Sequence, residues 1–177
     1  ECHGDLHLGN IALIEGRATP FDALEFNPSL RWIDVLNEMA FLVMDCTSRG
    51  QQPAAFAALN AYLEVSGDYA GLALLDFFCS YRAVVRAKVS LLAVLAPVVS
   101  GSEAHRGYLR YSALALVYQQ PRTLFLAICC GVSGSGKSTL AEALSAEAGA
   151  IRIRADVERK RLFGLEADAD SRGAGVD

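Results

Sequence analysis

Two acidic residues and an amide near the start of the chain have the types and the spacing that phosphoryl transfer requires. Residues 3–10 read His-Gly-Asp-Leu-His-Leu-Gly-Asn, so that four residues separate Asp5 from Asn10, and Asp22 follows after a predicted hairpin. In kinases an Asp accepts the proton of the acceptor hydroxyl, an Asn placed after four residues holds Mg²⁺, and a second Asp holds the metal that bridges the ATP phosphates. We therefore predict that Asp5 is catalytic and that Asn10 and Asp22 bind the metal.

The simpler interpretation of these residues is structural. Asp5 and Asp22 would then cap turns, and His3 and His7 would be loop histidines that hydrogen-bond locally. The ordered combination of Asp5, Asn10, a hairpin and a second Asp favours the functional interpretation over this one.

A second motif lies near the other end of the chain. Residues 131–138 read Gly-Val-Ser-Gly-Ser-Gly-Lys-Ser, which matches the P-loop pattern G-x-x-x-x-G-K-[ST], with a predicted strand before it and a predicted helix after it. Lys137 is expected to reach the β- and γ-phosphates of ATP, and Ser138 to bind Mg²⁺. A flexible Gly/Ser linker would explain the glycines but not the lysine, the strand or the helix. The predicted nucleotide-binding residues are Gly131, Ser133, Gly134, Ser135, Gly136, Lys137, Ser138 and Thr139.

The apolar pattern predicts the elements that position these motifs. Short apolar stretches at 11–14 and 18–22 predict a β-hairpin with Asn10 and Asp22 at its ends. Helical spacing predicts further helices at 27–46, 53–65, 69–96 and 103–119, with a loop over 98–107 and a stop at Pro97. The pattern then changes to a strand at 123–130, a helix at 140–148, a strand at 151–154 and the start of a helix at 157–163. The predicted fold class is α/β: a mostly helical lobe followed by the first β-P-loop-α-β unit of a parallel sheet.

Composition restricts the function classes. Hydrophobic residues make up 53% of the 177 residues and charged residues 20%, which predicts a globular protein with a buried core. A net charge of −4 argues against nucleic acid as a general partner and favours a small-molecule substrate. The apolar run at 83–99 contains Arg86 and Lys88, which predicts a buried helix and no membrane span. Five cysteines without metal-binding spacing predict reduced, mostly buried thiols and a cytoplasmic protein.

Segments 3–10, 21–28 and 31–40 resemble the aminoglycoside phosphotransferase family, whose catalytic loop reads His-Gly-Asp-x-His-x-x-Asn and whose metal-binding Asp follows a strand. The resemblance covers about residues 1–120 and implies the C-terminal lobe of a protein-kinase-like fold, with ATP and Mg²⁺ as cofactors. Glu38 stands where the family usually has Asp, at a position with a structural role. Arg82 and Arg86 share one face of a predicted helix, where substrate contact and a solvated or acid-paired face are alternative interpretations. The family name does not establish an antibiotic acceptor, because this fold serves kinases of very different acceptors.

The segment from Arg154 to Arg161 resembles the Asp-x-x-Arg element of zeta toxin, polynucleotide kinase and related P-loop kinases. This resemblance implies Asp156 as a base for an acceptor hydroxyl and Arg159 as a clamp for the acceptor or a phosphate. The alternative is that Asp156 caps a helix whose basic face is solvated. Both interpretations remain open from the sequence.

The order of the two motifs resembles bacterial bifunctional proteins in which an aminoglycoside phosphotransferase-like domain precedes a P-loop domain. This organisation predicts domains at 1–120 and 121–177. The chain begins at Glu1 directly before the first motif and ends before a parallel sheet can be completed, so both domains are expected to be truncated. The predicted function is ATP-dependent transfer of a phosphoryl group to a hydroxyl of an unidentified small molecule. The alternative is a P-loop ATPase of the AAA kind or a nucleotide sensor, whose kinase-like domain is a noncatalytic binding module.

Overall fold

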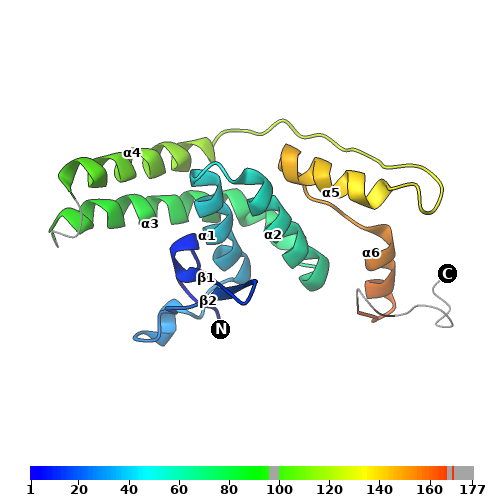
Figure 1. Ribbon diagram of the computed structural model, residues 1–177, viewed down its shortest axis with the longest axis horizontal. Helices are drawn as coiled ribbons and strands as arrows, with labels where there is room; N and C mark the ends of the chain where they lie inside the picture. Colours follow the sequence, from blue (N-terminus) through cyan, green and yellow to red (C-terminus); the bar gives the residue numbers. More distant parts are fainter. Residues whose placement is uncertain (96–99, 167–168, 170–177) are drawn as a thin grey trace. The chain divides into compact units, whose positions relative to one another are not determined.

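A computed structural model describes residues 1–95, 100–166 and 169, and its chain divides into two compact units. The first unit comprises Glu1–Gln51 and Ala70–Phe125, and the second comprises Gln52–Tyr69 and Leu126–Asp177. The described residues are mixed α/β and mostly helical, with one small antiparallel sheet in the first unit (Figure 1).

The predicted hairpin is confirmed. Its strands are β1 (Ile11–Ile14) and β2 (Arg17–Pro20), which pair antiparallel with Ile11 opposite Pro20 and Ile14 opposite Arg17. Glu15 and Gly16 form the turn with φ values of 51° and 76°. Two consecutive positive φ angles are those of a type I′ turn, whose twist matches that of the two strands. At the open end of the hairpin the amide of Phe21 donates to the carbonyl of Asn10 at 3.0 Å. The residue after β2 is thus bonded to the last residue of the first motif.

The helix predicted from residue 27 is instead two elements. A single 3₁₀ turn at Pro28–Leu30 is capped by Asn27, and α1 (Val35–Ser48) begins separately. The side chain of Asp34 accepts the amide of Leu36 at 2.8 Å and so caps α1. The prediction of a start at 27–29 is wrong because this second capping residue satisfies the free amides of the helix seven residues later.

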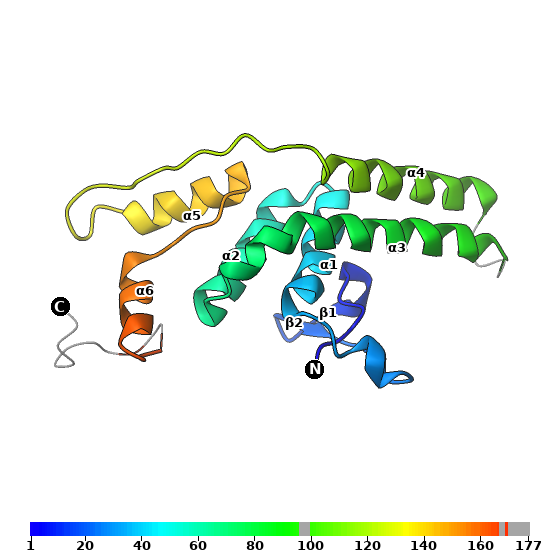
Figure 2. The same cartoon turned by 180° about the vertical axis from the view of Figure 1, so that it is seen from behind.

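Helices α1, α3 and α4 form the core of the first unit. A 3₁₀ segment at Ala70–Leu74 leads into α3 (Leu75–Leu95), and α4 is Gly101–Val117. Figures 1 and 2 show α3 and α4 running side by side. α4 begins within the predicted loop because Ser100 caps it by accepting the amide of Glu103. The predicted stop at Pro97 lies outside the described residues.

Helices α2, α5 and α6 belong to the second unit. Their bounds are Gln52–Ser66, Lys137–Ala148 and Ala155–Leu162, close to the predicted ones. Gly149 ends α5 with a φ of +63°, and a Cβ at this position would lie 3.1 Å from the Phe56 ring of α2. The sequence places α2 before the predicted boundary at residue 120, whereas the structure groups it with the P-loop segment.

The strands predicted at 123–130 and 151–154 do not form. Leu124, Leu126 and Ile128 are 90%, 87% and 77% exposed, and Cys129 and Cys130 are exposed rather than buried. A parallel strand needs hydrogen-bonding neighbours, and within residues 1–95 and 100–166 only β1 and β2 pair as strands. An apolar sequence therefore shows which segment can enter a sheet, but the sheet itself depends on partner strands. In the same ranges no helix is long and apolar enough to cross a membrane.

Candidate active site

Glu38 holds the beginning of the first motif. It lies on α1 and is buried, and its Oε2 accepts the amide of Gly4 at 2.6 Å while Oε1 accepts the amide of Leu6 at 3.0 Å. Gly4 has a φ of +89°, and a Cβ there would come within 2.9 Å of the carbonyl oxygen of Leu30. The close approach of the loop to its surroundings therefore requires glycine at this position.

Asp45 holds the next turn of the same loop. It is fully buried, and its Oδ2 accepts the amide of Leu8 at 3.0 Å while its Oδ1 accepts the hydroxyl of Tyr111 at 3.2 Å. Glu38 and Asp45 lie two turns apart on one face of α1, so a single rigid helix carries both carboxylates. The sequence analysis missed Asp45, although two acids seven residues apart on a mostly apolar helix are a recognisable signal.

Arg82 of α3 completes the support of the loop. It is buried, donates from NH1 to the carbonyl of Gly4 at 3.2 Å, and donates from Nε to Oδ1 of Asn37 at 2.8 Å. Its guanidinium also lies 4.8 Å from the ring centre of Phe41. Arg82 binds the backbone of the first motif and forms no ion pair within the described residues, so the interpretation of a solvated or acid-paired face is wrong for this residue. The interpretation of substrate contact stays a prediction.

The structure brings Asp5 and Asn10 together. The side-chain amide nitrogen of Asn10 donates to the backbone carbonyl of Asp5 at 3.0 Å and lies 3.3 Å from Oδ2 of Asp5. Asn10 is buried, and its nitrogen is used in these contacts, so Oδ1 is the atom that it can offer to a cation.

His7 orients the Asp5 carboxylate. Its Nδ1 accepts the amide of Gly9 at 3.0 Å, which places the proton of the neutral ring on Nε2, and Nε2 lies 3.5 Å from Oδ2 of Asp5. The hydrogen bond from His7 is the largest influence on the pKa of Asp5 and lowers it; burial opposes this effect, and the positive charges of Arg86 and Arg82 add to it. Asp5 is therefore ionised at neutral pH and able to accept a proton.

Asp22 is exposed and is connected to the loop through its neighbour. The carbonyl of Phe21 accepts Nε2 of His3 at 2.7 Å, and the amide of Leu24 donates to the carbonyl of His3 at 3.1 Å. Asp22 has a φ of +61°, a conformation that is uncommon for residues other than glycine. In the described part of the chain no group of three or more His, Cys, Asp or Glu gathers as a metal site. Kinase sites of the predicted kind need only an Asn and an Asp, since the ATP phosphates supply the remaining oxygen ligands.

The P-loop of the second unit has the backbone that its sequence requires. Gly131, Gly134 and Gly136 have φ values of +148°, +78° and +82°, and Gly136 is the N-cap of α5. The curled loop brings Gly131 close to Ser135, since a Cβ on this glycine would lie 3.1 Å from Oγ of Ser135. Lys137 opens α5, and its Nζ donates to the carbonyl of Val132 at 2.6 Å.

Glycines in these conformations and amides at a helix N-terminus form the anion cradle that phosphate groups need. The residues of this segment therefore fit ATP with Mg²⁺. Ser138 and Thr139 lie in the exposed first turn of α5.

Asp156 and Arg159 lie on α6, but they are not in contact with each other. Asp156 is in the first turn, where NH2 of Arg154 donates to its Oδ2 at 2.7 Å and Nε of Arg154 donates to its Oδ1 at 3.3 Å. The hydrogen bonds from Arg154 are the largest influence on the pKa of Asp156 and lower it. Arg154 is the N-cap position of α6, so the alternative prediction of Asp156 as the capping residue is wrong. Arg159 is on the exposed face of the helix.

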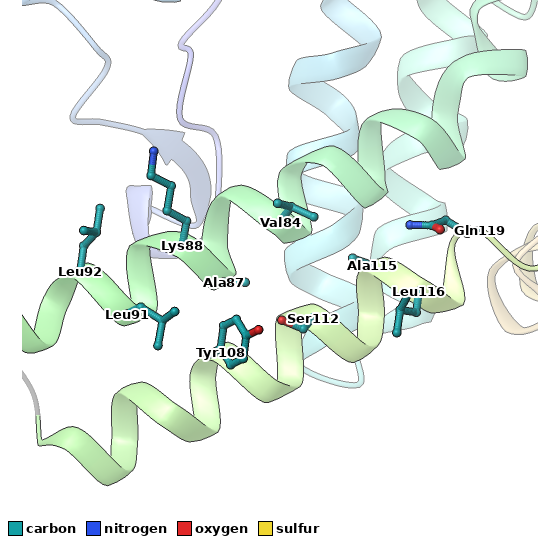
Figure 3. A pocket seen from close by; sticks show the side chains of 10 residues that line it. All are labelled: Val84, Ala87, Lys88, Leu91, Leu92, Tyr108, Ser112, Ala115, Leu116 and Gln119. Atoms are coloured by element: carbon teal, nitrogen blue, oxygen red, sulfur yellow. The ribbon is translucent and has the colours of Figure 1, made fainter.

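A hollow of about 530 Å³ lies between α3 and α4 in the first unit. Leu91 of α3 lines it opposite Tyr108 and Ser112 of α4 (Figure 3). None of the predicted site residues is among the described residues that line it.

Comparison with known proteins identifies one part of the chain. A family model described as an AAA domain matches residues 126–176. Those residues carry a P-loop nucleotide-binding domain of the kinase and ATPase class. No solved structure matches the chain significantly.

The chain is also similar to three longer proteins. Uncharacterized proteins of Mycobacterium bovis and of two strains of Mycobacterium tuberculosis are 38% identical to it over 160 residues. The match covers 90% of this chain and 32% of each relative, so the chain spans about a third of the length of these relatives. The names of these relatives state no activity.

Proposed function

We propose that the protein is an ATP-dependent phosphotransferase that transfers the γ-phosphoryl group of ATP to a hydroxyl of a small molecule. The observation that carries this proposal is the contact between Asp5 and Asn10, in a loop whose amides are held by the buried carboxylates of Glu38 and Asp45. If this loop were an ordinary turn, water could solvate its amides, and the buried carboxylates of Glu38 and Asp45 would not be needed to bind them.

In this proposal the acceptor oxygen forms a bond to the γ-phosphorus, the bond to the departing ADP breaks, and the hydroxyl proton passes to the carboxylate of Asp5. Asn10 and Asp22 are the residues that would hold Mg²⁺, which when bound neutralises charge on the phosphates. The lowered pKa of Asp5 makes it a weak base that is ionised at neutral pH. A weak base is sufficient when most of the activation barrier comes from transfer of the phosphoryl group.

The P-loop supplies a second ATP site in the same proposal. Backbone amides of residues 131–136 and the Lys137 ammonium would bind the phosphates, and Ser138 would hold Mg²⁺. Asp156 is the proposed base of this site, and Arg159 the proposed clamp.

The match to an AAA domain favours one alternative function. A P-loop ATPase or nucleotide sensor would hydrolyse or bind ATP in the second unit, while the first unit only binds a ligand.

The deciding experiment compares Asp5→Asn and Lys137→Ala in the full-length protein, with ATP binding and ATP turnover measured in the presence and absence of Mg²⁺. We expect Lys137→Ala to remove one of two ATP-binding sites. We expect Asp5→Asn to preserve ATP binding while it lowers turnover at the first site by about 10²–10⁴-fold, the usual contribution of general-base catalysis. If Asp5→Asn leaves both binding and turnover unchanged, the first unit is a binding module and the P-loop alone is active.

A further inference from the structure

The polar side of α2 is bonded to the segment that joins α5 to α6. Asn60 is buried, its Nδ2 donates to the carbonyl of Ala150 at 3.0 Å, and its Oδ1 accepts the amide of Arg152 at 2.7 Å. One side-chain amide thus satisfies a backbone acceptor and a backbone donor two residues apart, as a neighbouring strand would do. Residues 151–154 were predicted to be a strand. They do not form one, but Asn60 of α2 makes two backbone hydrogen bonds of the kind that a neighbouring strand would make.

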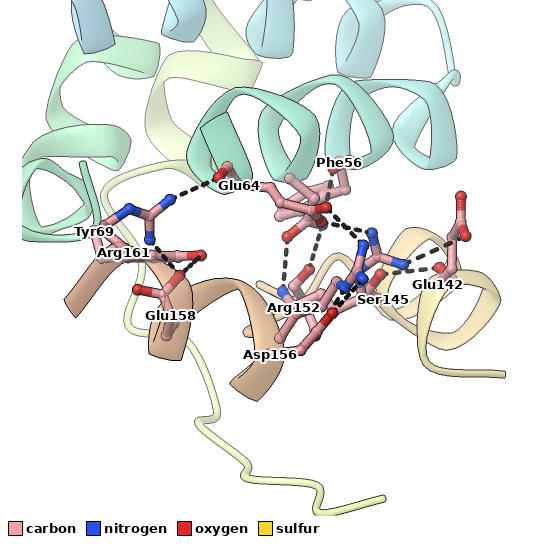
Figure 4. A network of polar contacts seen from close by, with 12 residues as sticks. Phe56, Glu64, Tyr69, Glu142, Ser145, Arg152, Asp156, Glu158 and Arg161 are labelled. Atoms are coloured by element: carbon pink, nitrogen blue, oxygen red, sulfur yellow. Dashed lines mark hydrogen bonds and ion pairs between the residues drawn. The ribbon is translucent and has the colours of Figure 1, made fainter. Parts of the chain in front are cut away.

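Glu64, one turn further along α2, binds two arginines of the same segment. Its Oε2 accepts NH2 of Arg152 at 3.0 Å (Figure 4). Its Oε1 accepts NH1 of Arg154 at 2.8 Å. The Glu64 backbone carbonyl also accepts NH2 of Arg161 from α6 at 2.6 Å. The side chains of Glu64 and Arg152 are only 21% and 16% exposed, so water screens their attraction less than in a surface pair.

The network continues from Glu64 to Asp156. Arg154 uses NH1 for Glu64, and it uses Nε and NH2 for the two carboxylate oxygens of Asp156. Its planar guanidinium therefore fixes the direction of the Asp156 side chain relative to α2. Arg152 connects Glu64 to α5, the helix that follows the P-loop, because NH1 of Arg152 donates to Glu142 of α5 at 3.3 Å.

We propose that Glu64 is a positioning residue for Asp156 and acts through Arg154. In this proposal α2 contributes to the activity of the P-loop domain. This inference rests on the proposed role of Asp156 in the second ATP site. Without the Glu64 carboxylate, the Arg152 and Arg154 guanidinium groups lose the anion that both of them bind. Their positive charges then repel each other, which disfavours holding both groups beside residue 64. Arg154 then no longer holds Asp156 in one direction.

The test uses Glu64→Gln in the full-length protein, in an Asp5→Asn background that silences the first site. Glu147→Gln is the matched control, since it removes the same charge from an exposed position of α5 that forms no ion pair within the described residues. The readouts are ATP affinity, ATP turnover at the P-loop site, and hydrogen exchange of the amides of residues 150–157. We expect Glu64→Gln to leave ATP affinity unchanged and to lower turnover about tenfold, the size of effect seen when a supporting residue of a site is lost. The same variant is expected to speed the exchange of these amides, and the control is expected to change neither quantity.

A second variant separates a positioning role from general destabilisation. Arg154→Gln removes the middle of the network, so the double variant with Glu64→Gln should be no slower than Arg154→Gln alone. The inference is overturned if the turnover losses of Glu64→Gln and Arg154→Gln add up in the double variant. It is also overturned if Glu64→Gln and the control Glu147→Gln show the same amide exchange and the same turnover. Asp156→Asn tests the proposed function separately: if turnover does not fall, Asp156 is not the base, whereas the exchange data still report whether Glu64 orders this segment.

Discussion

At the scale of single residues, the first site depends on how one carboxylate is held. Asp5 receives hydrogen bonds from Asn10 and is oriented by His7, whose own ring is fixed by the amide of Gly9. The sequence names all four residues, but it does not say which nitrogen of His7 faces the acid. That assignment follows only from the contact with Gly9.

We predict that His7→Ala raises the pKa of Asp5. The His7 contact stabilises the ionised carboxylate, while burial alone would raise the pKa of Asp5. In the native protein, the stability from this ionisation is complete above the ordinary Asp pKa and is lost as the pH falls through the lower folded value. The acidic limb of the pH profile for ATP turnover should therefore move to higher pH in His7→Ala. The loss of folding stability on acidification should become smaller, because the folded and unfolded pKa values of Asp5 come closer together.

Both quantities can be followed by turnover assays and by denaturant unfolding between neutral and acidic pH. An unchanged acidic limb in His7→Ala would show that another group controls the ionisation of Asp5. His105→Ala, at an exposed position of α4, is the matched control and should leave both profiles unchanged.

At the scale of elements, α1 is the frame of the first site. Its apolar residues pack in the core, while Glu38 and Asp45 turn toward the loop of the first motif and bind the amides of Gly4, Leu6 and Leu8. Buried carboxylates are costly without partners, and here backbone donors supply them. The helix thus fixes the loop through hydrogen bonds that a purely apolar helix could not make.

We predict that Glu38→Gln weakens this frame. A glutamine side chain has one acceptor oxygen and one donor group, so one of the two loop amides would face an NH₂ group and remain unsatisfied. The expected loss of unfolding free energy is about 1–3 kcal/mol, measured by denaturant titration, together with a fall in turnover at the first site. Glu25→Gln, an exposed acid of the neighbouring loop, should change stability by less than about 0.5 kcal/mol.

At the scale of the whole molecule, the chain contains two compact units, each with one of the two motifs. The first unit holds residues 3–22 on α1 and α3, and the second holds the P-loop with α2, α5 and α6. Because each motif is supported by residues of its own unit, we propose that the two ATP sites bind nucleotide independently.

Hydrogen exchange of the full-length protein with and without ATP and Mg²⁺ checks this independence. We expect ATP to protect amides of residues 4–10 and of residues 131–139 in the native protein. Lys137→Ala should remove protection from the second group and preserve it in the first, because only the P-loop loses its phosphate-binding cation. Loss of protection in both groups would instead indicate a single nucleotide site.

The local features of this protein could be predicted from the sequence alone. The hairpin, the P-loop and most helix bounds follow from signals carried by adjacent residues, such as Glu15-Gly16 in the turn and Gly149 after α5. Asp5 and Asn10 could be paired as well, because a known spacing connects them within one loop. Local propensity is sufficient where the residues that interact are close in the chain.

Only the tertiary structure decided which distant groups support each site. Asp45, Arg82 and Glu64 bind partners 37, 78 and 90 residues away in the chain, and no sequence pattern specifies such partners. The same reason explains the wrong strand prediction at 123–130, because a strand is completed by hydrogen bonds to other segments rather than by its own apolar residues. The sequence by itself therefore determined the local loops that carry the two motifs, and long-range packing determined which groups hold those loops in place.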